Sequence, residues 1–453
     1  MITPYQGERN MKKWMVLSVL FVLGVSALSA GVLTNTNQSA AYIRLLSRNP
    51  VMDIDGVYFN PAGLVKLSDG FHLAVHNQTI FQEKKVFNTF PLLNDPTYLG
   101  ETKVPVFPNV YAVYKKGRLA FSFGFGPNAG GGTADYPRGL PSFETPISQL
   151  PALVSGFGIP TTAYDADIAF EGSSIYLGFQ GNVSYALSEA VAVAAGVRYI
   201  QATNTYSGYI RDIRINPVFA GNPTGQMISA PDFFTAIKQP VYAAMTSDKA
   251  VDAKQTGSGF TPILSLNLTP SERFNFSVKY EFNTSLVLVN DTTEDDTGLF
   301  PDGVEFHNDI PAILGVGAQY AFTPKWRALA SFNYFFDKSA NWEGDEELVD
   351  KNTYELSLGM EYDLSGAITL SAGYLRTQFG LSEDYQSDFS NELSADTFGF
   401  GARIRATERL SIDLGALLNS YKDFTKTLTL GLEYDETYSK TTTAFAVGLN
   451  YRF

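Results

Sequence analysis

Apolar and polar residues alternate along most of the chain, from Gly70 to its end, in segments of about ten residues. Side chains on a β-strand point alternately to its two faces, so this pattern predicts strands with one apolar face. The last segment shows it most clearly. Its apolar face holds Phe445, Val447, Leu449, Tyr451 and Phe453. Its other face holds the small or polar residues Ala444, Ala446, Gly448, Asn450 and Arg452.

Fourteen such segments predict fourteen strands, at 70–81, 104–116, 118–127, 172–187, 189–211, 257–269, 272–288, 308–323, 325–338, 353–364, 366–379, 394–406, 408–420 and 441–453. The predicted connections alternate between short turns and long polar loops. The long loops are 82–103, 128–171, 212–256, 289–307, 339–352, 380–393 and 421–440. A soluble β-sandwich also alternates, but a strict succession of short and long connections is typical of outer-membrane barrels.

The fold class predicted for 70–453 is therefore an all-β transmembrane protein, a 14-stranded antiparallel outer-membrane β-barrel. No apolar run after residue 30 approaches the ~20 residues that a membrane helix needs. An even strand number places both ends of the barrel on the periplasmic side. The aromatic Phe453 at the end of the last strand is typical of a signal for the barrel assembly machinery. The expected location is the bacterial outer membrane, in contact with lipid and lipopolysaccharide.

The N-terminus has the pattern of a secretory signal peptide over residues 1–29. Lys12 and Lys13 precede an apolar run, and Ala27 and Ser29 fit a cleavage site. Residues 1–10 are interpreted as an upstream extension, with Met11 as a plausible start.

Residues 30–69 do not follow the strand pattern. This segment combines a polar run, a short helical pattern at Ala40 to Ser47, and two Asn-Pro breaks at Asn49-Pro50 and Asn60-Pro61. Either a folded N-terminal cap or a plug inside the barrel is compatible with the segment alone. The predicted inward faces favour the plug because they are rich in glycine, which persists in strands where another backbone comes close. These glycines are Gly178, Gly196, Gly315, Gly317, Gly359, Gly373, Gly399, Gly401, Gly415 and Gly448. Some of them are expected to mark bulges instead.

The opening TNTNQSAAYIR and the motif Asn60-Pro61-Ala62-Gly63 resemble the N-terminal hatch of the FadL/TodX family, which comprises outer-membrane channels for long-chain fatty acids and other hydrophobic compounds. The resemblance covers nearly the whole mature chain. It implies that residues 30–69 form a hatch in the lumen. It also implies that the external loops form an apolar groove for substrate, and that the third strand is kinked to open the barrel wall.

Two of the predicted external loops carry more apolar residues than water-facing loops need. Some fall at helical spacing. Either the loops pack on each other, or they expose a patch that binds a ligand. The residues assigned to substrate capture are Leu150, Leu153, Phe157, Phe233, Phe234, Ile237, Val241 and Met245.

The resemblance points to two further sites. A lateral opening is assigned to Gly124, Gly126 and Pro127 on the third strand, where glycine and proline weaken the hydrogen-bond ladder. Arg198 and Lys279, which are inward-facing, could receive a carboxylate head group. The alternative for these two cations is an ion pair, with Asp53 and Asp55 of the hatch or, for Lys279, with an acid on a neighbouring strand.

Composition narrows the functional classes. The 453-residue chain has no cysteine, which excludes disulfides and a thiol nucleophile, and its net charge of −13 disfavours nucleic acid as a partner. His72 and His76 share a strand face but lie too far apart to hold one metal ion. No catalytic arrangement is evident, so no enzyme activity, cofactor or metal is expected. The acidic loops could bind calcium, although their spacing matches no known loop motif.

The sequence therefore predicts a monomeric passive channel that takes up hydrophobic small molecules by loop capture, hatch rearrangement and lateral exit through the wall. The alternative is a plugged general porin or a structural or adhesive outer-membrane protein.

Overall fold

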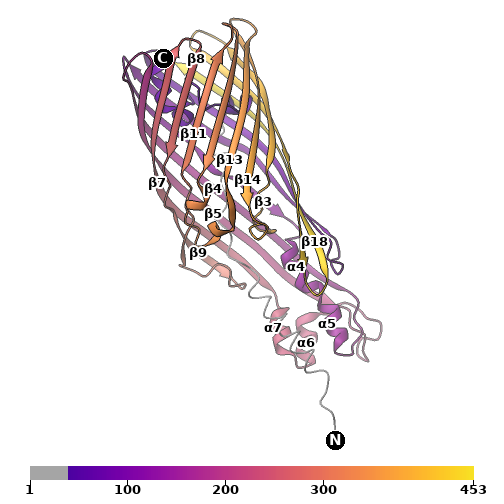
Figure 1. Ribbon diagram of the computed structural model, residues 1–453. Helices are drawn as coiled ribbons and strands as arrows, with labels where there is room; N and C mark the ends of the chain where they lie inside the picture. Colours follow the sequence, from indigo (N-terminus) through magenta and orange to yellow (C-terminus); the bar gives the residue numbers. More distant parts are fainter. Residues whose placement is uncertain (1–38) are drawn as a thin grey trace.

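The computed structural model describes residues 39–453 as one closed antiparallel barrel (Figure 1). Its wall has fourteen strand positions, as predicted. Twelve of them are β1 (Gly70–Asn88), β2 (Thr97–Lys116), β3 (Leu119–Tyr136), β4 (Tyr164–Ala186), β5 (Val191–Ile215), β7 (Lys249–Ser271), β12 (Trp326–Phe335), β13 (Val349–Asp363), β14 (Ile368–Leu381), β15 (Ala395–Arg405), β16 (Leu410–Tyr421) and β18 (Glu433–Arg452). The other two are interrupted strands, β8 (Phe274–Glu281) with β9 (Val287–Asp295), and β10 (Glu305–His307) with β11 (Ile313–Ala321). Pairing of β1 with β18 closes the ring.

The two faces of the wall follow the alternation in the sequence. In β18, Phe445 is 53% exposed and Leu449 is 50% exposed, whereas Ala444 and Ala446 face the interior and are buried. In β8 the inward positions are the polar residues Asn275, Ser277, Lys279 and Glu281. An apolar outer surface around a polar interior is the architecture of an outer-membrane barrel. No helix of the described residues is long and apolar enough to cross a membrane, a finding that does not bear on crossing by strands.

The strands are longer than predicted at the end that carries the long loops. β4 begins at Tyr164 rather than at residue 172, and β7 begins at Lys249 rather than at residue 257. The predicted loop lengths are wrong for a physical reason. Beyond the apolar band both faces of a strand meet water, so the alternation disappears while the ladder continues. The remaining connections contain the helices α4 (Pro141–Ser148), α5 (Leu150–Gly156), α6 (Ala230–Ala236) and α7 (Pro240–Met245). They also contain the short elements β6 (Ile228–Ser229), β17 (Phe424–Thr429), η2 (Asp337–Ser339) and η3 (Asp345–Leu348).

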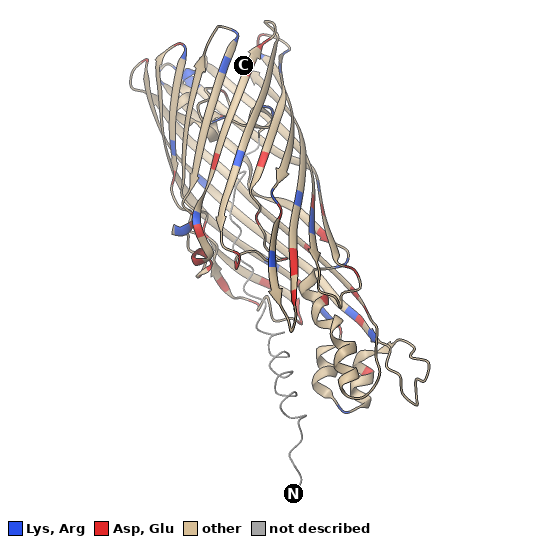
Figure 2. Cartoon of the chain, turned by 45° about the vertical axis from the view of Figure 1, so that its right-hand side comes forward, with Lys and Arg blue, Asp and Glu red and all other residues tan. Residues whose placement is uncertain are grey.

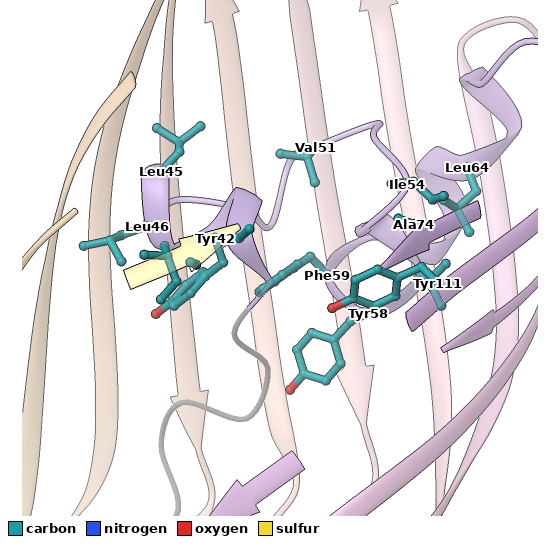
Figure 3. Packing of buried hydrophobic residues seen from close by; sticks show 14 of the residues in the cluster. Tyr42, Leu45, Leu46, Val51, Ile54, Tyr58, Phe59, Leu64, Ala74 and Tyr111 are labelled. Atoms are coloured by element: carbon teal, nitrogen blue, oxygen red, sulfur yellow. The ribbon is translucent and has the colours of Figure 1, made fainter. Parts of the chain in front are cut away.

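A segment inside the barrel, Ser39–Leu67, consists of α2 (Ala40–Arg44), α3 (Gly56–Phe59) and η1 (Pro61–Lys66) (Figure 3). We call it the lumenal segment. The Ser39 side chain caps α2 by accepting a hydrogen bond from the Tyr42 amide at 3.0 Å, and Pro61 begins η1 at a position that needs no amide donor. The predicted signal peptide and residues 30–38 of the predicted hatch lie outside the described residues.

The alternation of short and long connections makes a prediction about topology. Cysteines introduced at Ser142 and Thr235, which are exposed in the long loops, should react with an impermeant maleimide on intact cells. A cysteine at Ser271, in a short turn, should react only after the outer membrane is permeabilised. Gels that resolve the mass added by the label measure the reaction of each cysteine before and after permeabilisation. If only the cysteine at Ser271 were labelled on intact cells, the orientation of the barrel would be the opposite of the one predicted.

Candidate functional site

Inward-facing glycines form the surface on which the lumenal segment lies. A Cβ atom added at Gly317 would lie 2.6 Å from the Pro50 nitrogen, one at Gly399 would lie 2.5 Å from the Ile43 carbonyl oxygen, and one at Gly415 would lie 2.8 Å from the Arg44 amide nitrogen. Among the ten glycines predicted to face inward, Gly315, Gly317, Gly359, Gly373, Gly399, Gly401 and Gly415 meet this segment. The other three, Gly178, Gly196 and Gly448, meet side chains of the wall. At Gly317, Gly373, Gly399 and Gly415 the backbones of the segment and the wall therefore pack directly against each other.

The Asn60-Pro61-Ala62-Gly63 motif is docked on β4 and β7. The Asn60 amide donates hydrogen bonds to the Val51 carbonyl oxygen at 2.9 Å and to Asn267 at 2.7 Å, and its oxygen accepts one from the Gly63 amide. Ser184 donates a hydrogen bond to the Pro61 carbonyl oxygen at 2.7 Å. A Cβ atom at Gly63 would lie 2.5 Å from the Asn60 side chain, so only glycine fits there. The motif thus folds the segment and joins it to the wall.

Charged side chains join the other half of the lumenal segment to the wall. Arg44 contacts Asp413 at 2.7 Å and Glu361 at 2.6 Å, and Arg48 contacts Asp55 at 2.5 Å within the segment. The complete network contains four arginines and five carboxylates, namely Arg44, Arg48, Arg327, Arg403, Asp53, Asp55, Glu361, Asp363 and Asp413. Removing one partner from a buried ion pair costs about 3–5 kcal/mol, because the other charge is left buried without compensation. These contacts fix the position of α2.

Arg198 and Lys279 share one carboxylate. Arg198 contacts Glu281 at 2.7 Å, Lys279 contacts the same group at 2.5 Å, and the Lys279 ammonium also donates to the Tyr58 carbonyl oxygen at 2.9 Å. Both cations lie over the Tyr58 ring, at 4.6 Å and 4.0 Å from its centroid. The predicted pairing with Asp53 and Asp55 is wrong, because those carboxylates bind Arg48 and Arg403. Two cations with one anion leave one positive charge in excess.

A cluster of apolar side chains lies inside the barrel next to this charged group. It consists of Ala129, Tyr176, Ile200, Ala202, Leu286, Leu288 and Ile310, with Phe306 against it. We call it the lumenal apolar cluster. Leu286 reaches it from the stretch between β8 and β9, and Ile310 from the stretch between β10 and β11. A Cβ atom at Gly178 would touch both Arg198 and Asn128, so the cations adjoin β3 just before Ala129. The sequence does not reveal this cluster, because its residues, Phe306 included, come from five strands and two interruptions.

The hydrogen-bond ladder between β2 and β3 is interrupted beside that cluster. The two strands pair from Lys116↔Leu119 to Val110↔Phe125, and again only at Glu101↔Asp135. Residues 126–134 of β3 therefore have no β2 partner in the ladder. On its other side, β3 pairs with β4 through two bulges, at Pro127/Ala129 and at Gly130/Gly132. We call the unpaired stretch the β2–β3 gap.

The residues at the gap explain why the ladder stops. Pro105, Pro108 and Pro127 have no amide hydrogen to donate. Gly130 and Gly132 have φ angles of 87° and 88°, in the left-handed region that favours glycine. The strands nevertheless stay adjacent, since a Cβ atom at Gly126 would lie 3.2 Å from the Pro108 carbonyl oxygen. Of the three residues assigned to a lateral opening, Gly126 and Pro127 begin the gap. Gly124 pairs with Tyr111, one rung before the last pair Val110↔Phe125, and faces Val57 of the lumenal segment.

Two loops form a helical module at the far end of the barrel, with α4 (Pro141–Ser148), α5 (Leu150–Gly156), α6 (Ala230–Ala236) and α7 (Pro240–Met245) (Figure 1). We call it the loop module. Its core contains Leu150, Val154, Phe233 and Phe234, with Leu153 and Ile237 partly buried against them. Figure 2 shows that its helices carry few charged residues. The loops do pack on each other, as one of the two interpretations of their composition requires.

The module also leaves apolar side chains in contact with solvent. Phe157 is 42% exposed, and Val241 is 66% exposed. Val218, Phe219 and Met227, which lie in the same loop as Val241, are exposed about as much as Phe157 is, and Met245 is half-buried. Of the residues assigned to capture, Phe157 and Val241 are therefore accessible, whereas Leu150, Phe233 and Phe234 form the core that holds them.

A third loop is tied to the module. Asp388, between β14 and β15, accepts a hydrogen bond from the Ser142 amide at 2.7 Å, and Phe389 contacts Phe143 and Phe170 edge to face. Burial raises the pKa of the Asp388 carboxyl above its ordinary value. The acidic loops, which could have bound calcium, hold no group of three carboxylates or imidazoles within residues 39–453 that could take a metal ion.

A scan against protein-family models finds no match, and no curated protein matches the chain in sequence. Solved structures do match. A Pseudomonas aeruginosa FadL homologue is 14% identical with a TM-score of 0.64, covering 94% of this chain and 100% of its own. The Pseudomonas putida toluene transporter TodX is 13% identical with a TM-score of 0.59, at the same coverage. The Ralstonia pickettii toluene transporter TbuX is 14% identical with a TM-score of 0.54, covering 88% of this chain and 94% of its own. The fold implied by the resemblance to the FadL/TodX family is thus confirmed.

Proposed function

We propose that this chain is a passive outer-membrane channel for hydrophobic small molecules, which enter at the loop module and leave through the wall at the β2–β3 gap. The observation that carries the proposal is the position of the gap. The ladder stops beside the lumenal apolar cluster, in a barrel that also holds the lumenal segment. The solved structures with this fold include two toluene transporters and a FadL homologue, which supports a hydrophobic cargo.

The first step is capture from water. Phe157 and Val241 offer exposed apolar surface on a rigid module, and cargo that covers them gains about 25 cal/mol per Å² of apolar area removed from water. Loop contacts such as Phe143 with Phe389 lie between this surface and the lumen. Small shifts of these loops would let cargo move inward without an energy source, because binding only redistributes conformations that the protein already has.

The second step is transfer to the lumenal apolar cluster. Arg198 and Lys279 lie beside it with one positive charge in excess, so we assign them the head group of a carboxylate-bearing cargo. An uncharged cargo would use the apolar cluster alone. The Tyr58 carbonyl oxygen, which accepts from Lys279, places the lumenal segment in direct contact with this station. A shift of that segment would therefore change both the charge balance and the space at the cluster.

The third step is release at the β2–β3 gap. Opening a paired wall would break a row of hydrogen bonds in a medium that cannot replace them. Between residues 126 and 134 the ladder with β2 is already absent, so separation there costs side-chain contacts rather than backbone hydrogen bonds. Cargo leaving at this point enters the membrane directly and does not cross the periplasm.

Changing Phe157 and Val241 to serine tests capture. Losing about 60 Å² of apolar contact costs about 1.5 kcal/mol, so uptake at low concentration should fall roughly tenfold and recover at high concentration. Uptake of labelled toluene and of labelled laurate is measured in cells that express the protein and in cells that carry an empty vector. Val304→Ser with Leu432→Ser is the matched control, because both residues are exposed in other loops.

If the wild-type protein transports neither compound above the empty vector, the channel proposal is wrong. A plugged porin or an adhesive outer-membrane protein would then be the better account. If transport occurs but the Phe157 and Val241 variant matches its control at every concentration, only the capture step is wrong.

A further inference from the structure

Two cavities lie at the short-turn end of the barrel, the periplasmic end in barrels of this class. The outer cavity, of about 230 Å³, lies between the lumenal segment and the turn that joins β15 to β16. The inner cavity, of about 240 Å³, lies between the lumenal segment and strands β11 to β15. Asp53, Arg403 and Arg405 line both of them. We call the two cavities together the vestibule.

The vestibule is unusually basic for a chain of net charge −13. Its lining contains seven arginines, namely Arg44, Arg48, Arg327, Arg403, Arg405, Arg409 and Arg452, and three carboxylates, namely Asp53, Glu361 and Glu408. Figure 2 shows basic residues at the end of the barrel that carries the C-terminus. Asp55, Asp363 and Asp413, which do not line the cavities, pair with four of these arginines, so the positive charge that can attract anions from the periplasm lies on Arg405, Arg409 and Arg452.

The arginines of the vestibule fall into two groups. Four belong to the network that fixes the lumenal segment, where their carboxylate partners compensate them. Within residues 39–453, Arg405, Arg409 and Arg452 form no ion pair with Asp or Glu. Arg405 donates one hydrogen bond to the Gly366 carbonyl oxygen at 2.9 Å, and Arg452 donates one to Ser68 at 3.1 Å. A guanidinium has five N–H donors, so each of these two is held in place with donors to spare.

The outer lining also contains polar side chains, such as His72, Ser411 and Asn450, and a small apolar part. Ile54 and Leu67 come from the lumenal segment, and Leu410 and Tyr451 come from the wall. An apolar surface next to guanidinium donors fits an amphipathic anion better than a small inorganic ion. A carboxylate matches the planar fork of a guanidinium with two parallel hydrogen bonds.

We propose that the vestibule binds the carboxylate of a small amphipathic acid through Arg405, with Arg409 and Arg452 supplying further positive charge and Ile54 and Leu67 of the lumenal segment covering the start of the chain. This inference rests on the proposed function, because it gives the carboxylate-bearing cargo already assigned to Arg198 and Lys279 a second binding site. It also gives such a cargo a station on the periplasmic side, away from the β2–β3 gap. An anion bound here would compete with Asp53 for Arg403, a wall contact of the lumenal segment.

Octanoate labelled with ¹³C at its carboxyl carbon is the probe. The full-length protein is titrated in an uncharged detergent, and the carboxyl resonance separates saturable binding from partition into micelles. We expect a saturable shift for the wild-type protein. Arg405→Gln should weaken octanoate binding roughly fivefold to tenfold, which is the effect of losing a charge-assisted hydrogen bond at a partly exposed site. Arg273→Gln is the matched control, since Arg273 is exposed in another short turn and lines neither cavity.

Two further probes separate charge from chain. Labelled 1-octanol has the chain without the charge, and labelled acetate has the charge without the chain. Both should bind at least fivefold more weakly than octanoate. Equal binding of octanol would show that the guanidiniums are not used, and equal binding of acetate would show that the apolar lining is not used. Either result overturns the proposal, as does Arg405→Gln binding octanoate as tightly as the wild-type protein does. Toluene uptake by the wild-type protein tests the channel separately, so a protein that transports toluene without binding octanoate loses only this inference.

Discussion

Valine at both Gly399 and Gly415 should turn the barrel into an open pore. Each added Cβ atom would lie within 2.8 Å of the backbone of α2, at the Ile43 carbonyl oxygen and the Arg44 amide nitrogen. Neither contact can be relieved by rotating a side chain, because both atoms belong to the main chain. The wall should tolerate the change, since valine favours strands and both positions lie in continuous ladders. The lumenal segment must therefore leave its position.

Single-channel conductance in planar bilayers measures the result. A barrel of fourteen strands is wide enough to hold water when nothing fills it, so we expect a severalfold or larger rise in conductance. Heat-modifiable migration on gels shows that the barrel still folds. Gly181→Val is the control, because it lies in β4 and its added side chain would meet open space. Unchanged conductance in the folded double variant would mean that the lumenal segment does not block the ion path.

The packing and the charges of the lumenal segment both hold it in place, but they oppose its movement in different ways. Its apolar residues, such as Leu45, Val57 and Leu64, are buried against the wall, which stabilises it in place. Its charged residues are held by a network in which each arginine needs its partners. A shift in which each arginine exchanges one carboxylate partner for another costs far less free energy than a shift that leaves a buried charge without a partner. Movement of the segment should thus follow the network, with Asp53 and Arg403 at the edge that faces the vestibule.

Much of the barrel could be predicted from the sequence, because a membrane wall imposes a pattern on every residue. Phe445 and Ala446 must face opposite media, and that requirement repeats around the ring. Past the apolar band this requirement ends, and the predicted strand ends become inaccurate there. β4, for example, begins at Tyr164. The inward glycines could also be identified, since a strand accepts Gly399 only where something approaches closely.

The partners within the site could not be predicted in the same way. Arg198 was expected near Asp53 or Asp55, yet it pairs with Glu281, two strand positions away. Choosing among inward carboxylates needs the stagger of the strands, which alternation does not supply. Phe233 and Phe157 are equally apolar in the sequence, but one is buried and the other exposed. Only the packing of the two loops determines which of the two side chains is buried.

A disulfide across the first rung of the β2–β3 gap tests the route through the wall. Asn109 and Gly126 follow the last pair, Val110↔Phe125, and a Cβ atom at Gly126 would lie 2.9 Å from the Asn109 side-chain carbon Cγ. Cysteines at these two positions are close enough to join, and the chain has no other cysteine. The bond would hold β2 against β3 where the ladder is absent. The reduced form of the same protein is the internal reference, and Thr397→Cys with Asn419→Cys is the control, because that pair lies opposite in a continuous ladder.

The decisive measurement is the rate of toluene uptake by the Asn109→Cys, Gly126→Cys protein before and after treatment with a reductant. We predict uptake near that of the empty vector in the oxidised form and recovery to the wild-type rate after reduction, with no change for the control pair. Equal uptake in the oxidised and reduced forms would contradict release through the β2–β3 gap.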